Sequence, residues 1–241
     1  MPLYAHTGNI LLDRRYGAVI HDIACDEDRN RRLRAIANAL SRAGRHVYFV
    51  PYGASDALGD MGYALAAEEI VTDPRDVAWI DHGSGSTCTQ AGLLAGLLAM
   101  GHPARVAGVD VDAQAARIRA DVCRIGREAA TLLGCGARWD DTRVEVIGHW
   151  SGPAYGVADA TTEEAARLAA QLEGPALDPV YSGKGTAGLI GLARDGRFAH
   201  GGPVVRIRTG GGPGIFADPE TIARAAKLAI PASPVPGIFH G

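Results

Sequence analysis

Lysine is almost missing from this chain. Of the 24 basic residues among its 241, two are lysines, Lys184 and Lys227, and the arginines are scattered. The net charge of -3 gives no electrostatic basis for binding nucleic acid or an anionic membrane surface. We therefore expect no nucleic-acid and no membrane partner.

Motifs for metal binding and for export are also missing. The four cysteines include no pair at C-x-x-C spacing, and no histidine pair stands at zinc-ligand spacing nearby. Residues 1–15 lack the basic start and apolar run of a signal peptide, and no apolar run is long enough to span a bilayer. We therefore expect no metal, reduced thiols and a cytoplasmic location.

Strand-like and helix-like segments alternate along the chain. Apolar, β-rich stretches predict strands at 18–24, 46–51, 76–81, 105–111, 143–150 and 203–214. Apolar residues at helical spacing predict helices at 26–44, 57–71, 89–100, 113–133, 161–175 and 184–194. This order predicts an α/β fold in which helices cover both faces of a parallel sheet.

Polar or glycine-rich turns follow several of the predicted strands. The turns at 82–90, 148–156 and 209–214 would all lie at the carboxyl ends of parallel strands. Ligands of open α/β sheets bind at that edge. We therefore expect the three turns to converge on one site.

The turn "GSGSTCTQAG", residues 83–92, has the composition of a phosphate cradle. Its glycines let backbone N–H groups turn inward, the Ser86, Thr87 and Thr89 hydroxyls add donors, and a helix N-terminus follows. The stretch lacks the G-K-[ST] of a Walker loop and the third glycine of a dinucleotide fingerprint. A glycine-rich turn without a ligand is the alternative interpretation.

Two further stretches carry candidate site residues. In "TGGGPG", Thr209 precedes glycines that allow a large group to approach the backbone, with a plain loop turn as the alternative. Tyr155 and Tyr181 stand in proline- and glycine-rich settings. A tyrosine so placed transfers protons if its pKa is lowered, and the alternative is a buried tyrosine with a satisfied hydroxyl.

The stretches 8–18, 50–63, 83–92, 155–198 and 208–216 together resemble a known family. It is the 1-aminocyclopropane-1-carboxylate deaminase and D-cysteine desulfhydrase group of fold-type-II pyridoxal-phosphate enzymes. The resemblance covers nearly the whole chain in family order, and its longest block includes "LDPVYSGKGTAGLIGLARDGRF". It implies a three-layer, tryptophan synthase beta-like fold and the cofactor pyridoxal 5'-phosphate. The implied reaction is that of a lyase or deaminase acting on a small amino acid.

The resemblance also assigns roles to residues. It places the cofactor phosphate at Ser86, Thr87, Cys88 and Thr89, the pyridine ring at Thr209 and Gly210, and catalytic roles at Tyr155 and Tyr181. Ser182 and Thr209 look like the desulfhydrase branch, because the deaminase branch carries glutamate and leucine at these positions. The stretch "TQAG" looks more like the deaminase branch, so the subfamily stays open.

One family feature is not matched. The Schiff-base lysine of the family lies in a segment before the part matched here, and Lys184 matches a different family lysine. A lone lysine among small, polar and aromatic residues otherwise points to Schiff-base chemistry. We therefore expect an N-terminally incomplete enzyme, in which residues 1–50 are the remaining part of a small domain and 51–241 form the large cofactor-binding domain.

Three hypotheses account for the unmatched lysine. The chain is one subunit of a split enzyme, a truncated reading frame of an ordinary one, or a non-catalytic subunit that binds the cofactor or phosphate as a regulator or scaffold. In the first two cases the chain should expose apolar surface and sheet edges. We therefore expect a lysine-bearing N-terminal half as a partner, or self-association as a dimer.

Overall fold

The structure is a computed structural model that describes residues 6–24, 27–73, 76–199, 201–219 and 222–223. The chain begins with the helices α1 (Gly8–Arg15) and α2 (Arg29–Arg42), the short 3-10 helix η2 (Tyr52–Ala54) and α3 (Asp60–Val71). The sheet region then runs through β1 (Trp79–Ser84), α4 (Cys88–Met100), β2 (Arg105–Asp110), α5 (Ala115–Leu132), η3 (Gly136–Arg138), η4 (Asp141–Arg143) and β3 (Glu145–Ile147). It ends with α6 (Ala160–Leu172), α7 (Ser182–Arg194), β4 (Val204–Ile207) and η5 (Gly212–Ala217).

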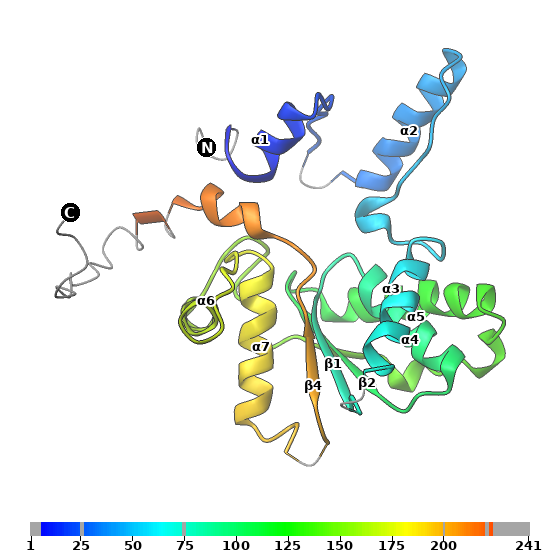
Figure 1. The fold of residues 1–241 in the computed structure, drawn as a ribbon. Coiled ribbons are helices and arrows are strands. Elements are labelled where there is room, and N and C mark those ends of the chain that lie inside the picture. Colours follow the sequence, from blue (N-terminus) through cyan, green and yellow to red (C-terminus); the bar gives the residue numbers. More distant parts are fainter. Residues whose placement is uncertain (1–5, 25–26, 74–75, 200, 220–221, 224–241) are drawn as a thin grey trace, which may run out of the picture.

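The four strands of the described residues form one sheet in the order β3-β2-β1-β4, and every pair is parallel. Figure 1 shows β1 and β4 side by side although about half of the chain, residues 85–203, separates them in sequence. A parallel sheet needs helical crossovers, and these helices cover its two faces. The α/β prediction is therefore confirmed.

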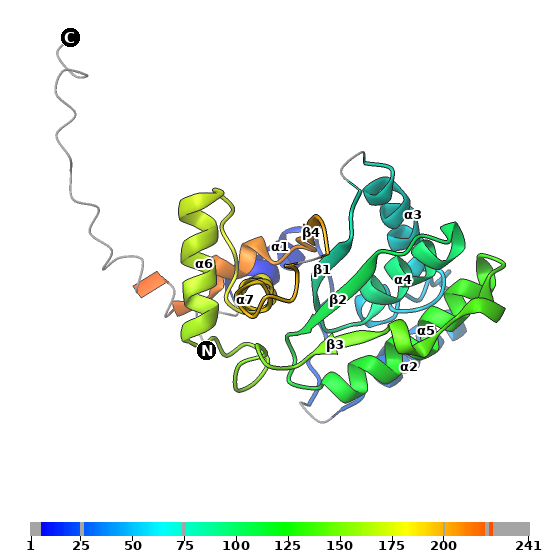
Figure 2. The ribbon, with the colours of Figure 1, turned by 90° about the horizontal axis from the view of Figure 1, so that it is seen from below.

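Three layers make up the sheet region. On one face α7 packs against β1 and β2, with α6 packed on α7; on the other, α4 and α5 pack against the strands, with α3 packed on α4. Figure 2 shows the sheet between these two helical layers. The larger core lies on the α4–α5 side and includes Ile80, Leu93, Leu97, Val106 and Ile125.

An ion pair joins the edge strand β4 to its neighbour β1. Arg206 of β4 donates to Oδ1 of Asp81 in β1, a side chain that is fully buried. Burial raises the pKa of Asp81 to about 6, and the nearby Arg206 guanidinium opposes that rise. Because burying a charge without a partner is costly, Arg206 is the main compensation for this carboxylate.

The region before residue 50 departs from the sequence prediction. The segments 18–24 and 46–51 were predicted as strands. Neither segment forms a strand in the structure, so this prediction was wrong. No residue of α2 is buried, and in Figure 1 this helix extends away from the sheet region. Two other strands were predicted too long, because β3 and β4 stop at Ile147 and Ile207.

The described helices offer no membrane span, since none combines the length and the hydropathy that crossing a bilayer requires. Within the same residues, no three His, Cys, Asp or Glu side chains gather into a group that could hold a metal ion. Cys88, Cys123 and Cys135 are buried free thiols.

Candidate functional site

A cavity of about 910 Å³ lies at the carboxyl edge of the sheet. All three turns that follow the predicted strands reach it, as expected for turns at the ends of parallel strands. Six of the eight predicted site residues line it: Ser86, Thr89, Tyr155, Tyr181, Thr209 and Gly210. Asn9 and Ile10 of α1 complete one wall, although they lie far from the others in sequence.

The start of α4 has the geometry of an anion site. Thr87 is the N-cap of this helix, yet its side chain makes no capping hydrogen bond, and its φ of 84° lies in the left-handed region. That conformation is strained for a β-branched residue and is found mainly at functional turns. The uncapped N–H groups of the first turn and the helix dipole are therefore available to an anion in the cavity.

The side chains of Thr87 and Cys88 point away from the cavity. Both are buried, and neither lines the cavity wall. The Cys88 thiol contacts the carboxyl of Asp60, a fully buried side chain whose two oxygens accept no hydrogen bond from an N–H or O–H group. Burial, and then the Asp60 carboxyl, raise the pKa of Cys88 to about 12, which leaves the thiol protonated. Of these two residues, only the backbone is left to act in anion binding.

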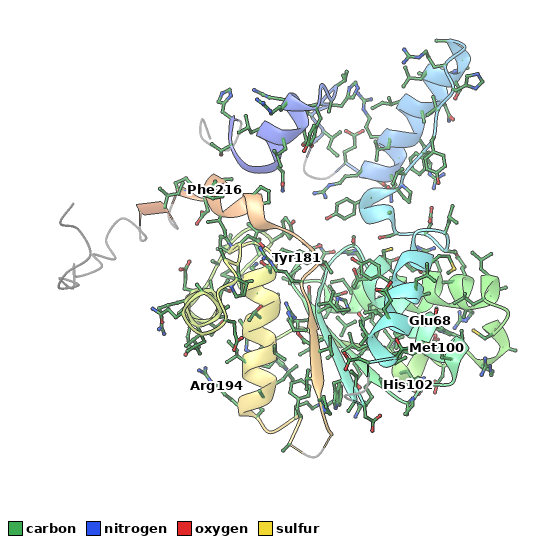
Figure 3. All side chains as sticks on the ribbon, viewed as in Figure 1. Glu68, Met100, His102, Tyr181, Arg194 and Phe216 are labelled. Carbon is green, nitrogen blue, oxygen red and sulfur yellow. The ribbon has the colours of Figure 1, made fainter. Side chains whose placement is uncertain are left out.

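Tyr181 lies immediately before α7, with its ring against β1. In Figure 3 it lies at one end of α7, with Arg194 at the other. Its hydroxyl donates a 2.6 Å hydrogen bond to the carbonyl of Gly83, and a Cβ built on Gly83 would be 3.1 Å from the ring. Burial raises the pKa of Tyr181 to about 12, against a smaller opposing effect of Thr209. The sequence argument required a lowered pKa for proton transfer, and this arrangement does not provide one.

Tyr155 and the Thr209–Gly211 segment form other parts of the wall. Tyr155 is 48% exposed, and partial burial raises the pKa of its hydroxyl. Gly210 and Gly211 have φ values of 125° and 91°, which L side chains rarely adopt. These glycines present bare backbone to the cavity.

Lys184 is the single lysine among the residues that the structure describes, since Lys227 lies outside them. Its side chain is fully buried on α7, and its Nζ donates a 2.6 Å hydrogen bond to the carbonyl of Ala154. Burial lowers the pKa of Lys184, while Asp159, Asp112 and Asp110 oppose that change. The residue does not line the cavity, so its amine holds the loop before α6 in place.

Sequence reasoning missed Asp178 as a site residue. It stands three positions before Tyr181, lines the cavity and is buried. Its carboxylate accepts a hydrogen bond from the hydroxyl of Ser182, the position at which the deaminase branch carries glutamate. The "DP" before a helix start was the available signal, since aspartate there caps backbone N–H groups.

This chain belongs to the family described as "Pyridoxal-phosphate dependent enzyme", whose model matches residues 1–210. It is 34% identical over 226 residues to a 1-aminocyclopropane-1-carboxylate deaminase of Burkholderia ambifaria, covering 91% of this chain and 67% of that protein. It is 35% identical over 222 residues to a D-cysteine desulfhydrase of Salmonella typhi, covering 89% of this chain and 65% of that protein.

A solved structure described as an ACC deaminase homologue superposes with a TM-score of 0.81 at 31% identity. That superposition covers 92% of this chain and 67% of the other. The chain thus spans about two thirds of the length of its relatives. The family resemblance inferred from the sequence is confirmed, and pyridoxal phosphate is the cofactor of the family.

The cavity fits most of this cofactor. The uncapped start of α4 suits its phosphate, and the bare glycine backbone beside Thr209 suits a flat ring. The covalent anchor is the part that the described residues do not supply, because the amine of Lys184 is buried and engaged elsewhere. The site is therefore compatible with the cofactor's phosphate and ring, but no residue that the structure describes brings a lysine to face them.

Proposed function

We propose that this chain is the larger part of a pyridoxal-phosphate dependent lyase or deaminase that acts on a small amino acid. The observation that carries the proposal is the cavity at the carboxyl edge of the sheet, where the α4 start, two tyrosines and the glycine segment meet. D-cysteine and 1-aminocyclopropane-1-carboxylate are the first substrates to test, because the relatives are named for them.

Each part of the cavity has a task in this function. Bound pyridoxal phosphate supplies an electron sink for negative charge that develops on an amino acid. The first turn of α4, with the Ser86 and Thr89 hydroxyls, binds the phosphate, while the Thr209 hydroxyl meets the ring edge. Tyr181 keeps its proton at neutral pH, so it acts as a proton source at its hydroxyl oxygen once that hydroxyl turns from the Gly83 carbonyl to the substrate.

Binding is the first measurement. The full chain is titrated with pyridoxal phosphate and, separately, with inorganic phosphate, and tryptophan fluorescence follows both. Replacing Thr89 with valine should lower the affinity for both ligands by about tenfold, because it removes one hydrogen bond to a charged group. Thr142→Val is the matched control, since that hydroxyl is bonded to Asp140 far from the cavity. No affinity of the wild-type chain for either ligand would refute the proposed function.

The anchoring lysine comes, in this proposal, from a partner chain related to the third of the relatives that this chain does not cover. The apolar face of α2 supports such a partner, because Leu33 and Leu40 are 40% and 42% exposed. The unpaired segments 18–24 and 46–51 flank this helix and offer backbone groups for strand pairing.

Borohydride reduction tests where the lysine lies. The chain is mixed with pyridoxal phosphate, reduced, digested and mapped, alone and with the product of a neighbouring coding segment. Label on a lysine of that product, together with release of a 2-oxo acid and ammonia, is the expected result. Label on Lys184 or Lys227 in the chain alone would show that this chain supplies its own anchor, from the same copy or from a second one.

A non-catalytic binding subunit is the second candidate function. The engaged amine of Lys184 favours it, since a regulator or scaffold needs the cofactor cavity without an anchor. Saturable binding of pyridoxal phosphate, with no turnover of any small amino acid in the presence of the partner, is the outcome that would replace the enzyme proposal with this one.

A further inference from the structure

Asp178 lies at the junction of two cavity walls. The residue is 1% exposed and lines the cavity. Its carboxylate faces the turn that begins α7 on one side and the glycine segment that follows β4 on the other. No step of the proposed function so far uses this carboxylate.

On the α7 side, the carboxylate accepts four hydrogen bonds from residues 180–182. Oδ2 accepts from the backbone N–H groups of Val180 at 3.1 Å and Tyr181 at 2.7 Å. Oδ1 accepts from the N–H of Ser182 at 3.0 Å and from its hydroxyl. Four donors on one carboxylate fix the direction in which Tyr181 leaves the turn, because hydrogen bonds to a charged acceptor are short and strong.

On the other side, the glycine segment lies directly on the same carboxylate. A Cβ built on Gly211 would be 2.2 Å from Oδ1 of Asp178, and one built on Gly214 would be 3.2 Å from its Cβ. The backbone of Gly211 therefore takes its position from Asp178. A side chain at residue 211 would push the carboxylate out of its place.

The contacts continue to the sheet through Tyr181, whose hydroxyl bonds the Gly83 carbonyl of β1. Asp178 thus connects three cavity parts: the glycine segment, the α7 start and the end of β1. The α4 turn with Ser86 and Thr89 has no described hydrogen bond to Asp178. The carboxylate supports the ring side of the cavity and not the phosphate side.

We propose that Asp178 is a positioning residue whose carboxylate holds Tyr181 and the Gly210–Gly214 segment in the arrangement that receives the pyridine ring. This inference rests on the proposed function for the identity of the ligand. A purely structural helix cap is the alternative, and it predicts a loss of stability without selective loss of the ring side.

The test compares two ligands and two aspartates. Asp178→Asn keeps the shape but replaces one acceptor oxygen with an amide that cannot accept. This variant should lower the affinity for pyridoxal phosphate by about tenfold or more, which is equivalent to at least about 1.4 kcal/mol. It should lower the affinity for inorganic phosphate by less than about twofold. Asp110→Asn is the matched control, because Asp110 is also 1% exposed and caps the turn after β2 through Asp112 and Gln114. Equal weakening of both ligands, or the same result in the control, overturns the proposal.

Hydrogen exchange of the full chain gives a second readout that needs no cofactor. Asp178→Asn should speed exchange at 180–182 and at 210–214 and leave 86–90 unchanged. Unchanged exchange at 210–214 overturns the positioning role even if the chain binds pyridoxal phosphate. A wild-type chain that binds no pyridoxal phosphate but shows this exchange pattern refutes the proposed function and supports the role of Asp178 in shaping this wall.

A glycine variant tests the same proposal if Asp178→Asn fails to fold. Gly211→Ala leaves Asp178 intact but places a methyl group on its carboxylate, so the same selective loss of pyridoxal phosphate is expected. Gly196→Ala is its control, since Gly196 also has a positive φ, 75°, but nothing within 4 Å of an added Cβ. If Gly211→Ala lowers the affinity for pyridoxal phosphate no more than Gly196→Ala does, the result counts against the proposal.

Discussion

Every residue of β1 is buried, whereas no residue of α2 is. The apolar residues of 76–81 and 26–44 predict a strand in the first segment and an amphipathic helix in the second. The strand lies between two helical layers, whereas the helix extends away from the sheet region with Leu33 and Leu40 of its apolar face 40% and 42% exposed. In the proposed function, a partner chain would cover the apolar face of α2 as the helical layers cover β1. Four predictions test this contrast.

The largest expected effect is in the buried region. Arg206→Ala removes the partner of Asp81 and leaves a buried carboxylate uncompensated, so the free energy of unfolding should fall by about 3–5 kcal/mol. Urea denaturation followed by tryptophan fluorescence measures it. Arg124→Ala is the control, because its pairs with Asp121 and Glu128 are half-exposed and contribute at most about 1 kcal/mol. Similar losses in both variants would contradict the importance of the Asp81 pair.

The next largest effect is expected in the cavity at the carboxyl edge of the sheet. Tyr181→Phe should lower turnover in the assembled enzyme by about a hundredfold, since a positioned proton donor contributes on that scale. Affinity for pyridoxal phosphate should change by less than about threefold, because the hydroxyl is bonded to Gly83. Steady-state kinetics and a binding titration separate the two quantities. Tyr16→Phe, at a fully exposed tyrosine, serves as the control, and equal losses of turnover and affinity would argue against proton transfer.

A smaller effect depends on pH. The pKa of Asp60 is raised to about 7, chiefly by burial. The charges of Asp56 and Glu128 raise this pKa further, whereas the Cys88 thiol and Arg124 lower it. Because the unfolded chain has the ordinary value of 3.8, stability is greatest below that pH and is lost as pH rises to about 7. The stability gained by Asp60→Asn should therefore increase by about 2 kcal/mol between pH 5 and pH 8.

Thermal or urea unfolding at the two pH values measures this gain. Asp140→Asn is the control: hydrogen bonds from Thr142 hold the pKa of Asp140 below its usual value of 3.8, so its contribution is lost only below that pH and the variant should show no change between pH 5 and pH 8. A gain for Asp60→Asn that is the same at both pH values would contradict a buried, titrating carboxyl.

The smallest effect on stability is expected on α2. Replacing Leu33 and Leu40 together with glutamate should change the free energy of unfolding of the chain alone by less than about 0.5 kcal/mol, as for exposed positions. The same change should abolish association with the partner, as measured by analytical ultracentrifugation. Asn38→Glu on the opposite face of the helix should leave association intact. A large loss of stability in the chain alone would mean that α2 is packed within it.

The sequence predicted the sheet region well because its signals are local and agree with one another. Apolar runs placed the four strands, and the rule for parallel sheets placed Ser86, Tyr155 and Thr209 around one cavity. The predicted strands at 18–24 and 46–51 have the same local composition but no pairing partner in the described chain. Composition predicts that a segment can join a sheet, and only the presence of the neighbouring strand decides whether it does.

Other features of the site depend on three-dimensional contacts that no local pattern encodes. Thr87 has a left-handed conformation, and neither its side chain nor that of Cys88 lines the cavity, although the resemblance grouped both with Ser86. The contact of Asp178 with Gly211 joins residues that are far apart in sequence. The catalytic roles of Tyr155 and Tyr181 and the domain boundary at residue 50 remain predictions.

The scarcity of lysine has a chemical consequence for a protein that binds an aldehyde. Free pyridoxal phosphate condenses with any accessible amine, whereas the guanidinium of arginine stays protonated and is a poor nucleophile. Across the described residues the single side-chain amine, Lys184, is enclosed and hydrogen-bonded. This surface therefore carries its positive charge in a form that does not compete for the aldehyde, which leaves the cofactor free to react with the one amine intended for it.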